Sequence, residues 1–387
     1  MELSKRKITV TTGTRAEYGI LRSLLKEIKK NKKLELFLLV TGSHLSKKNG
    51  YKIKDIKKDR FKIFYKIPMV TSDNETDVVK GLGFSMAKFA TIFKKIKPDF
   101  NLVLGDRGEM LASSIAAYHM NIPNVHIHGG DVSGGIDEYT RHAITKISNI
   151  HFVATEKSKK RVLRMGENPK YVFVTGSLSL DEIVQGNFTD KKTLMKKYNV
   201  KLDNHTIILL QHPVTTQNEY TEKQIKTTLK AISQIGYQTI AISPNADPGN
   251  SKIFKQLNFL SKKYKFVNFY ASLPREDYLG FLKYSGVLVG NSSSGLIEGS
   301  YFGIPVINIG SRQLRREKAK NVIDVTNDDS DAIKRKLLST INSKKNRYPV
   351  SYIYGKGNSS KKIVKYLETI KISKELIEKQ YYNKNER

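Results

Sequence analysis

Residues 101–106 read NLVLGD and residues 286–291 read GVLVGN, and a helix-length segment follows each of these runs. An Ile-Pro pair and a second apolar run come next, NVHI at 124–127 and VINI at 306–309. Each stretch reads as strand, glycine-polar turn, helix, Ile-Pro and strand, which is typical of a parallel βαβ unit. The repeat therefore predicts two similar doubly wound domains.

The same alternation of short apolar runs and amphipathic segments continues along the chain. It predicts strands at 7–12, 35–40, 63–67, 100–104 and 124–128, and near 206–211, 238–242, 266–270, 286–289 and 305–309; the first-half helices are predicted near 16–30, 77–96 and 108–120. We expect an α/β fold of two Rossmann-like domains with parallel sheets, at 1–176 and 177–357, and a helical tail at 358–383 that packs back on the domains. Such sheets bind ligands at the carboxyl ends of their strands, so we expect a cleft there, between the domains.

The composition limits the class of protein and its compartment. Of the 387 residues, 39% are hydrophobic and 27% are charged, as in soluble globular proteins. The N-terminus lacks the apolar stretch of a signal peptide, and no apolar run approaches the roughly 18 residues of a membrane span. The absence of cysteine excludes disulfides, thiolate catalysis and cysteine metal sites. We expect a cytoplasmic protein with no membrane partner.

The net charge of +32 raises the question of nucleic-acid binding. Much of this charge lies in lysine-rich segments at 26–33, 52–62 and 343–346 that read as solvent-facing helix. Exposed charges more than about 10 Å apart are largely screened at physiological salt, so this charge attracts anions without selecting among them. No zinc-finger or ribonucleoprotein motif is present, and we expect no nucleic-acid partner.

Two strand-end turns of the first half carry cations. TGTRAEYG at 12–19 enters a helix, where backbone N–H groups and Arg15 favour an anion. GDRGE at 105–109 places the Asp106 carboxylate beside the Arg107 guanidinium. Each turn has a simpler interpretation as the start of a helix, because glycines and aspartates are common there.

The third turn holds the largest group of polar residues. HIHGGDVSGGID at 126–137 is followed by Arg141 and His142. His126 and His128 alternate on a predicted strand and are expected to face the same side. With Asp131 they would make a metal site, or they pack in the core, or they line a polar substrate site. The glycines favour the substrate site, and we predict no metal ligands.

The fourth turn, GNSSSG at 290–295, lies in the second half. Serine hydroxyls and N–H groups at a helix start hold a diphosphate, although the serines alone also fit a helix cap. Glu298 is placed to accept ribose hydroxyls, and strand ends bring His212 and Arg312 to the same edge. Together the turns predict a nucleoside diphosphate site, with Asp106, Asp137 and histidines for proton transfer.

With these motifs, the chain resembles the hydrolysing UDP-N-acetylglucosamine 2-epimerases of sialic acid biosynthesis over nearly its whole length. The resemblance rests on TGTRAEYG at 12–19, TGSHL at 41–45, GDR at 105–107, GGDVSGGIDEYTRHAITK at 129–146, QHPVTT at 211–216, GNSSSGLIE at 290–298 and FGIPVINIGSRQ at 302–313. It implies the GT-B fold, elimination of UDP to a 2-acetamidoglucal, and addition of water. It implies no cofactor, and we expect a homo-oligomer, a dimer or a tetramer.

The resemblance also implies roles for residues at matching positions. Asp106 and Asp137 would be acid–base residues, with His128 and His212 as further candidates for catalysis. The substrate would be held by Arg15, His44, Arg107, Asp131, Arg141, His142, Ser292, Ser293, Glu298 and Arg312.

One residue departs from the pattern of the sialic acid enzymes. His128 stands where those enzymes carry a catalytic glutamate, and relatives that make legionaminic acid precursors resemble this variant. Their substrate is a diacetamido-trideoxyhexose on UDP, namely UDP-N,N'-diacetylbacillosamine, which is the alternative to UDP-N-acetylglucosamine here. A non-hydrolysing epimerase and a GT-B glycosyltransferase, which needs an acceptor, are the remaining alternatives.

Metal independence is the first testable expectation. Because Arg15, Arg107 and Arg312 already supply positive charge for a diphosphate, activity on the nucleotide sugar should be unchanged by EDTA. Release of UDP before and after chelation measures this. If a chelated, inactive enzyme regained activity with zinc or manganese, the histidines would belong to a metal site.

Overall fold

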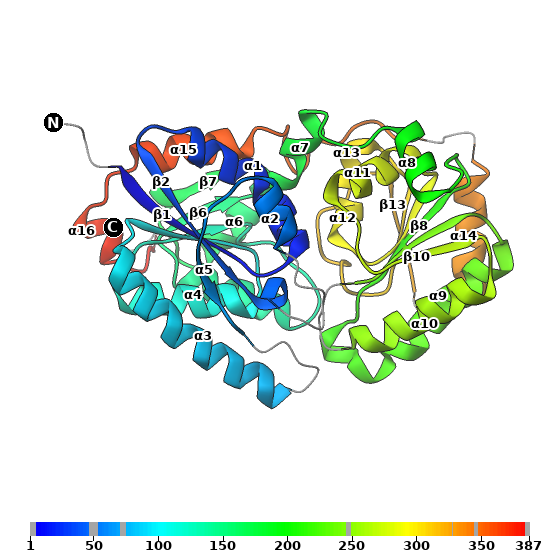
Figure 1. The fold of residues 1–387 in the computed structure, drawn as a ribbon, viewed down its shortest axis with the longest axis horizontal. Coiled ribbons are helices and arrows are strands. Elements are labelled where there is room, and N and C mark those ends of the chain that lie inside the picture. The colour runs from blue at the N-terminus through cyan, green and yellow to red at the C-terminus, as the bar shows by residue number, and fades with distance from the viewer. Residues whose placement is uncertain are drawn as a thin grey trace. The chain divides into compact units, whose positions relative to one another are not determined.

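The computed structural model describes residues 5–45, 53–69, 75–244, 249–326, 328–343 and 347–383, and the chain forms two compact units (Figure 1). The first unit comprises 1–131, 137–181 and 355–387, and the second comprises 132–136 and 182–354. The chain thus passes from the first unit to the second after Asp181, whereas the sequence placed this change after residue 176. The glycine-rich segment 132–136 groups with the second unit.

The first unit is built on a sheet of seven parallel strands in the order β3-β2-β1-β4-β5-β6-β7. The strands are β1 (Arg6–Thr12), β2 (Leu34–Thr41), β3 (Ile63–Ile67), β4 (Phe100–Leu104), β5 (Asn124–Ile127), β6 (Ile150–Val153) and β7 (Val172–Val174). The sequence predicted the first five to within about two residues. It missed β6 and β7, of four and three residues.

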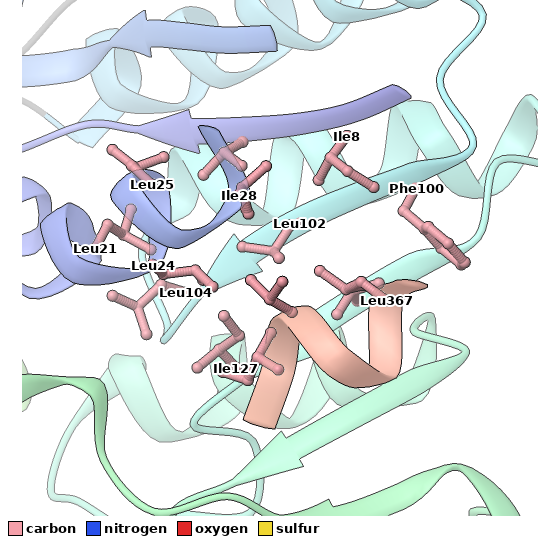
Figure 2. Close-up of a cluster of buried hydrophobic side chains, with 14 of the residues drawn as sticks. Ile8, Leu21, Leu24, Leu25, Ile28, Phe100, Leu102, Leu104, Ile127 and Leu367 are labelled. Carbon is pink, nitrogen blue, oxygen red and sulfur yellow. The ribbon is translucent and has the colours of Figure 1, made fainter. Parts of the chain in front are cut away.

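Helices cover both faces of this sheet. The helices and short 3₁₀ turns of this unit are α1 (Arg15–Lys30), η1 (Gly42–Leu45), α2 (Lys54–Lys58), α3 (Glu75–Ile96), α4 (Gly108–His119), α5 (Ile136–Lys146), α6 (Glu156–Arg164), η2 (Pro169–Tyr171), η3 (Leu178–Leu180), α15 (Ser359–Thr369) and α16 (Lys374–Ile377). The short helix α7 (Asp181–Val184) begins at the last residue of this stretch of the first unit and continues into the second. On one face, α1 and α15 bury Leu21, Leu24 and Leu367 against the strand residues Ile8 and Leu102 (Figure 2). On the other face, α3 and α4 form a second apolar cluster.

The second unit repeats the scheme with six parallel strands in the order β10-β9-β8-β11-β12-β13. The strands are β8 (Ile207–Leu210), β9 (Thr239–Ile242), β10 (Val267–Tyr270), β11 (Val287–Gly290), β12 (Val306–Ile309) and β13 (Val322–Val325). The other elements are α8 (Lys191–Tyr198), η4 (Thr215–Tyr220), α9 (Thr221–Ile235), α10 (Asn250–Lys263), α11 (Arg275–Tyr284), α12 (Ser293–Leu296), α13 (Glu298–Phe302) and α14 (Ser330–Ile341). The prediction of an α/β fold with two parallel sheets is confirmed.

In each sheet the strand order reverses at one point. β1 lies between β2 and β4, and β8 lies between β9 and β11. Parallel α/β sheets bind ligands outside the carboxyl ends of the strands at such a switch point. The turns that the sequence singled out after β1, β4, β8 and β11 therefore come in pairs at these two positions.

The C-terminal segment belongs to the first unit but is not one helix. α15 ends at Thr369, and α16 begins after Ser373, whose extended backbone lets its hydroxyl accept the Leu376 N–H. The Asp181 carboxylate accepts the backbone N–H groups of Ser359 and Ser360 at 3.0 and 2.7 Å and so binds the start of α15. In the part of the chain that the structure describes, no helix is long and apolar enough to cross a membrane.

A buried group of charges fastens the end of the chain. The Glu167 side chain is 1% exposed, and its carboxylate binds Lys379 Nζ at 2.5 Å, Lys146 Nζ at 2.8 Å and His151 Nε2 at 2.9 Å. Burial alone would raise the pKa of Glu167, but the His151 hydrogen bond and the lysine charges lower it to about 2. Burial also lowers the pKa of His151, so its neutral ring donates Nε2–H to the carboxylate.

Removing this charge should destabilise the first unit. Glu167→Gln leaves the buried Lys379 ammonium without its anion, and we expect a loss of about 3 kcal/mol in unfolding free energy at pH 7. Glu375→Gln, which breaks the exposed pair with Lys170, is the matched control and should leave the unfolding midpoint unchanged. Because the pKa of Glu167 is depressed, its contribution is complete above about pH 4.5 and is lost as the pH falls toward 2. An equal difference between parent and variant at pH 3 and pH 7 would contradict this assignment.

Candidate functional site

The turn after β4 carries Asp106 and Arg107 and is fixed by its backbone. Gly105 has a left-handed φ of 78°, its N–H donates to the Ile127 carbonyl at 2.9 Å, and its carbonyl accepts His126 Nε2–H at 2.7 Å. A residue with a Cβ is strained in this conformation, which explains the glycine. The turn therefore presents Asp106 and Arg107 at the carboxyl end of the sheet.

Asp106 is bound by a buried arginine. The Arg141 side chain, on α5 and 4% exposed, places its NH2 group on the Asp106 carboxylate and donates NH1 to the Asp131 carbonyl at 3.0 Å. Asp131 in turn accepts the Ser158 hydroxyl at 2.7 Å. The sequence assigned Arg141 and Asp131 to substrate contacts. The structure brings both together with Asp106 and gives Arg141 a further role, because it supplies the counter-charge that orients this carboxylate.

The two histidines of this region differ in their surroundings. His126 is fully buried, and its second ring nitrogen lies 3.1 Å from the Thr145 hydroxyl. Burial lowers its pKa to about 3, so the ring is neutral and supports the Gly105 turn. His128 follows β5 with a left-handed φ of 64°, and its N–H donates to Phe152. Side-chain alternation holds for extended backbone, so the left-handed φ of His128 removes the basis for the expectation that both histidines face the same side, which stays a prediction.

The described residues contain no group of three or more His, Asp or Glu side chains arranged to hold a metal ion. The metal-site alternative built on His126, His128 and Asp131 therefore has no geometric support. Both nitrogens of His126 are engaged with Gly105 and Thr145. One Asp131 carboxylate oxygen accepts the Ser158 hydroxyl.

The remaining first-unit candidates lie on three elements. Asp137 is half-buried in the first turn of α5, and His142 Nε2 lies 4.0 Å from Glu138 one turn away. His44, on η1, is fully buried with Nε2 3.2 Å from the Thr12 hydroxyl. Arg15 opens α1 and binds Asp55 at 2.6 Å. His44 is thus tied to the end of β1, whereas Arg15 has a carboxylate partner on α2 that sequence reasoning did not identify.

In the second unit, Asn291 connects three of the predicted residues. Its side-chain oxygen accepts the His212 N–H at 2.6 Å, and its amide donates to the His212 carbonyl at 2.9 Å. Its own carbonyl accepts Arg312 NH1 at 3.1 Å. Ser292 follows directly and caps α12, where its hydroxyl accepts the Ser294 N–H at 3.3 Å. Asn291 lies within the GNSSSG motif, but the sequence gave no reason to assign it a role.

Glu298 begins α13 and is 3% exposed. Arg275 NH2 lies 3.2 Å from its carboxylate, and Arg275 Nε lies 3.3 Å from Glu182, so one guanidinium connects both acids. Ser293 opens α12, and the neighbouring Ser294 hydroxyl accepts Tyr278 Oη–H at 2.6 Å. Arg275 was missed because it lies on α11, outside every strand-end turn. Its ion pair with Glu298 in the folded chain identifies it as part of this site.

Two doubly wound units with polar groups at both switch points define a ligand-binding α/β protein with the organisation of the GT-B fold. The chain matches the UDP-N-acetylglucosamine 2-epimerase family over residues 26–368 and belongs to it. It is 38% identical to the hydrolysing UDP-N,N'-diacetylbacillosamine 2-epimerase of Legionella pneumophila, over 97% of this chain and 98% of the relative. It is 39% identical to the hydrolysing GDP/UDP-N,N'-diacetylbacillosamine 2-epimerase of Campylobacter jejuni, over 87% of this chain and 88% of that one.

The fold is also similar to that of solved structures. The UDP-GlcNAc 2-epimerase from Neisseria meningitidis, bound to UDP-GlcNAc, superposes with a TM-score of 0.79, at 19% identity over 93% of this chain and 99% of that chain. This likeness confirms the fold. The family membership and the hydrolysing relatives come from the sequence comparisons.

The left-handed backbone at His128 leads to a designed pair of variants. His128→Ala and His128→Gly both remove the imidazole, but only glycine also relieves the left-handed strain of about 1 kcal/mol. If the imidazole moves a proton, both variants should lose about 100-fold in turnover and keep the parent's UDP affinity. Turnover by NMR and UDP binding by calorimetry measure this, with Asp137→Asn expected to be worse. Parent-level turnover in either variant would remove His128 from the mechanism.

Proposed function

We propose that the protein is a hydrolysing 2-epimerase of a UDP-linked 2-acetamido sugar. The observation that carries the proposal is Arg141, which is buried and binds both the Asp106 carboxylate and the Asp131 carbonyl. A guanidinium fixed in this way holds one carboxylate in a single orientation at the strand end, as proton transfer at a defined carbon requires. Membership of the epimerase family supplies the reaction class.

The chemistry proceeds in two balanced steps. In the first, the C2–H bond and the C1–O bond to the diphosphate break, a C1=C2 double bond forms, and UDP leaves. In the second, water adds its oxygen to C1, and a proton returns to C2 from the opposite face. The hydrogen at C2 is not adjacent to a carbonyl, so charge separation toward the departing diphosphate must accompany its removal. Stabilising that charge therefore dominates the barrier, at about 3 kcal/mol for each positioned donor.

The residues divide between the two parts of the substrate. In this proposal Asp106, Asp137 and His128 exchange protons with the sugar, with His44 and His142 beside it. Arg141 and Asp131 maintain the turn that carries Asp106. The UDP is held by Arg15, Arg107, His212, Ser292, Ser293 and Arg312. Glu298 accepts the ribose hydroxyls, and Arg275 orients its carboxylate.

For the sugar, we propose the diacetamido-trideoxyhexose of UDP-N,N'-diacetylbacillosamine. The sequence favoured UDP-N-acetylglucosamine first, with this sugar as the alternative. The two diacetylbacillosamine epimerases, at 38% and 39% identity over most of the chain, now reverse that preference. His128 also supports it, because relatives that make legionaminic acid precursors resemble this variant at the position where the sialic acid enzymes carry a glutamate.

A proton NMR time course on both nucleotide sugars, without acceptor, tests the proposal. UDP and the free 2-epimerised sugar should appear together, faster from UDP-N,N'-diacetylbacillosamine than from UDP-N-acetylglucosamine. In heavy water the product should carry deuterium at C2, because one proton is removed and another is added. Accumulation of a UDP-linked epimer would indicate a non-hydrolysing enzyme. Turnover only with an added acceptor would indicate a glycosyltransferase.

A further inference from the structure

Three turns of the first sheet meet around one buried carboxylate. Glu109, in the first turn of α4, is 3% exposed, and its Oε1 accepts a hydrogen bond from Arg107 Nε at 2.8 Å. A Cβ placed on Gly13, after β1, would lie 1.9 Å from that oxygen, and one on Gly42, after β2, would lie 3.2 Å from it. The ends of β1, β2 and β4 therefore enclose this carboxylate, and the two glycines leave the space that it occupies.

A second acid is buried beside the first. Glu17, in the first turn of α1, is 7% exposed, and among the described residues neither of its carboxyl oxygens makes a hydrogen bond of normal geometry. Its pKa is raised from 4.5 to about 8, first by burial and then by the charge of Glu109, while Arg107, Thr12 and Gly13 act in the opposite direction. At neutral pH Glu17 is thus mainly protonated, and Glu109 is the anion that faces Arg107.

We infer that Glu109 and Glu17 form a buried acid pair that positions Arg107 for the nucleotide sugar, with Glu109 as the anchor that binds the guanidinium and Glu17 as its buried neighbour. The inference rests on the proposed function, which assigns Arg107 to the UDP. Neither acid is assigned a contact with the substrate. Both are positioning residues, because they act through the guanidinium.

The groups around the pair explain why it holds one negative charge rather than two. Arg107 is the cation that binds Glu109. On η1, His44 Nε2 lies 3.2 Å from the Thr12 hydroxyl. Also on α1, the Tyr18 hydroxyl and Arg22 both bind Asp59, at 2.6 and 2.7 Å. Burial, and then the repulsion from Glu109, raise the pKa of Glu17, so the second acid keeps its proton at neutral pH.

The pair therefore gives the site an upper pH limit. As the pH rises through about 8, Glu17 loses its proton, and a second negative charge appears beside Arg107. That charge weakens the attraction between the guanidinium and a diphosphate. In Glu17→Gln the amide has the shape of the protonated acid and no acidic proton to lose. This variant should therefore bind UDP like the parent at pH 7 and better than the parent at pH 9.5.

Calorimetric titration of the full-length protein with UDP between pH 7 and 9.5 tests the inference. We expect the parent's affinity to fall about tenfold over this range and that of Glu17→Gln to change less than about twofold. Glu109→Gln should lose about tenfold already at pH 7, because the guanidinium loses its anchor. Glu27→Gln, on the same helix as Glu17 and paired with Lys30, is the matched control and should follow the parent throughout.

Thermal unfolding supplies a readout that does not depend on the substrate. Since the pKa of Glu17 is raised on folding, its contribution to stability is complete below about pH 4.5 and is lost as the pH rises through 8. The stability of Glu17→Gln relative to the parent should therefore increase from pH 4.5 to pH 8. A constant difference over this range would show that the pKa of Glu17 is not raised on folding.

Arg107→Ala separates this inference from the proposed function. If it binds UDP as tightly as the parent while the parent turns over the nucleotide sugar, the family reaction holds, but Arg107 and its acid pair have no part in UDP binding. If it weakens UDP binding while Glu17→Gln shows the parent's pH profile, the positioning role of Glu17 is wrong. If the parent releases no UDP from either sugar, the proposed function itself fails.

Discussion

In each sheet one central strand is paired in parallel on both sides, and the strand order reverses across it. β1 is bonded to β2 and β4, and β8 to β9 and β11. Parallel pairing forces the carboxyl ends of neighbouring strands to one edge, while the connecting helices diverge to opposite faces. The edge at the switch point stays uncovered by helices, so the polar turns there are adjacent to one another. The arrangement of the functional residues depends on this constraint.

The first unit shows how closely the turns depend on one another. The Gly13 carbonyl accepts the Ser43 hydroxyl at 3.1 Å and the His44 N–H at 3.3 Å, which joins the ends of β1 and β2. Glu109 fills the remaining space and joins the end of β4. His126 joins the end of β5 to Gly105. The residues that maintain the edge are therefore as important as those assigned to the substrate.

Charge has two separate functions in this protein. The excess of positive charge that gives the net charge of +32 lies largely in lysine-rich segments, where solvent and salt screen it. Burying a charge is costly unless a partner compensates it, and the cations inside the units illustrate the rule. Arg141 binds Asp106, Arg275 bridges Glu182 and Glu298, and Lys379 binds Glu167. Each of these pairs fixes one group in one place, which the surface charge cannot do.

The sequence by itself determined the two βαβ repeats, the strands around each switch point and the turns that carry the candidate residues. It could do so because strand alternation, turn glycines and the motifs are local in the chain. It missed the strands β6, β7 and β13, and it gave the tail one helix where Ser373 starts a second. Only the tertiary structure decided that Arg141 serves Asp106, that Arg275 orients Glu298 and that Glu17 and Glu109 share one buried space. Those partners lie on different elements, and their burial and mutual charge exist only after the chain has folded.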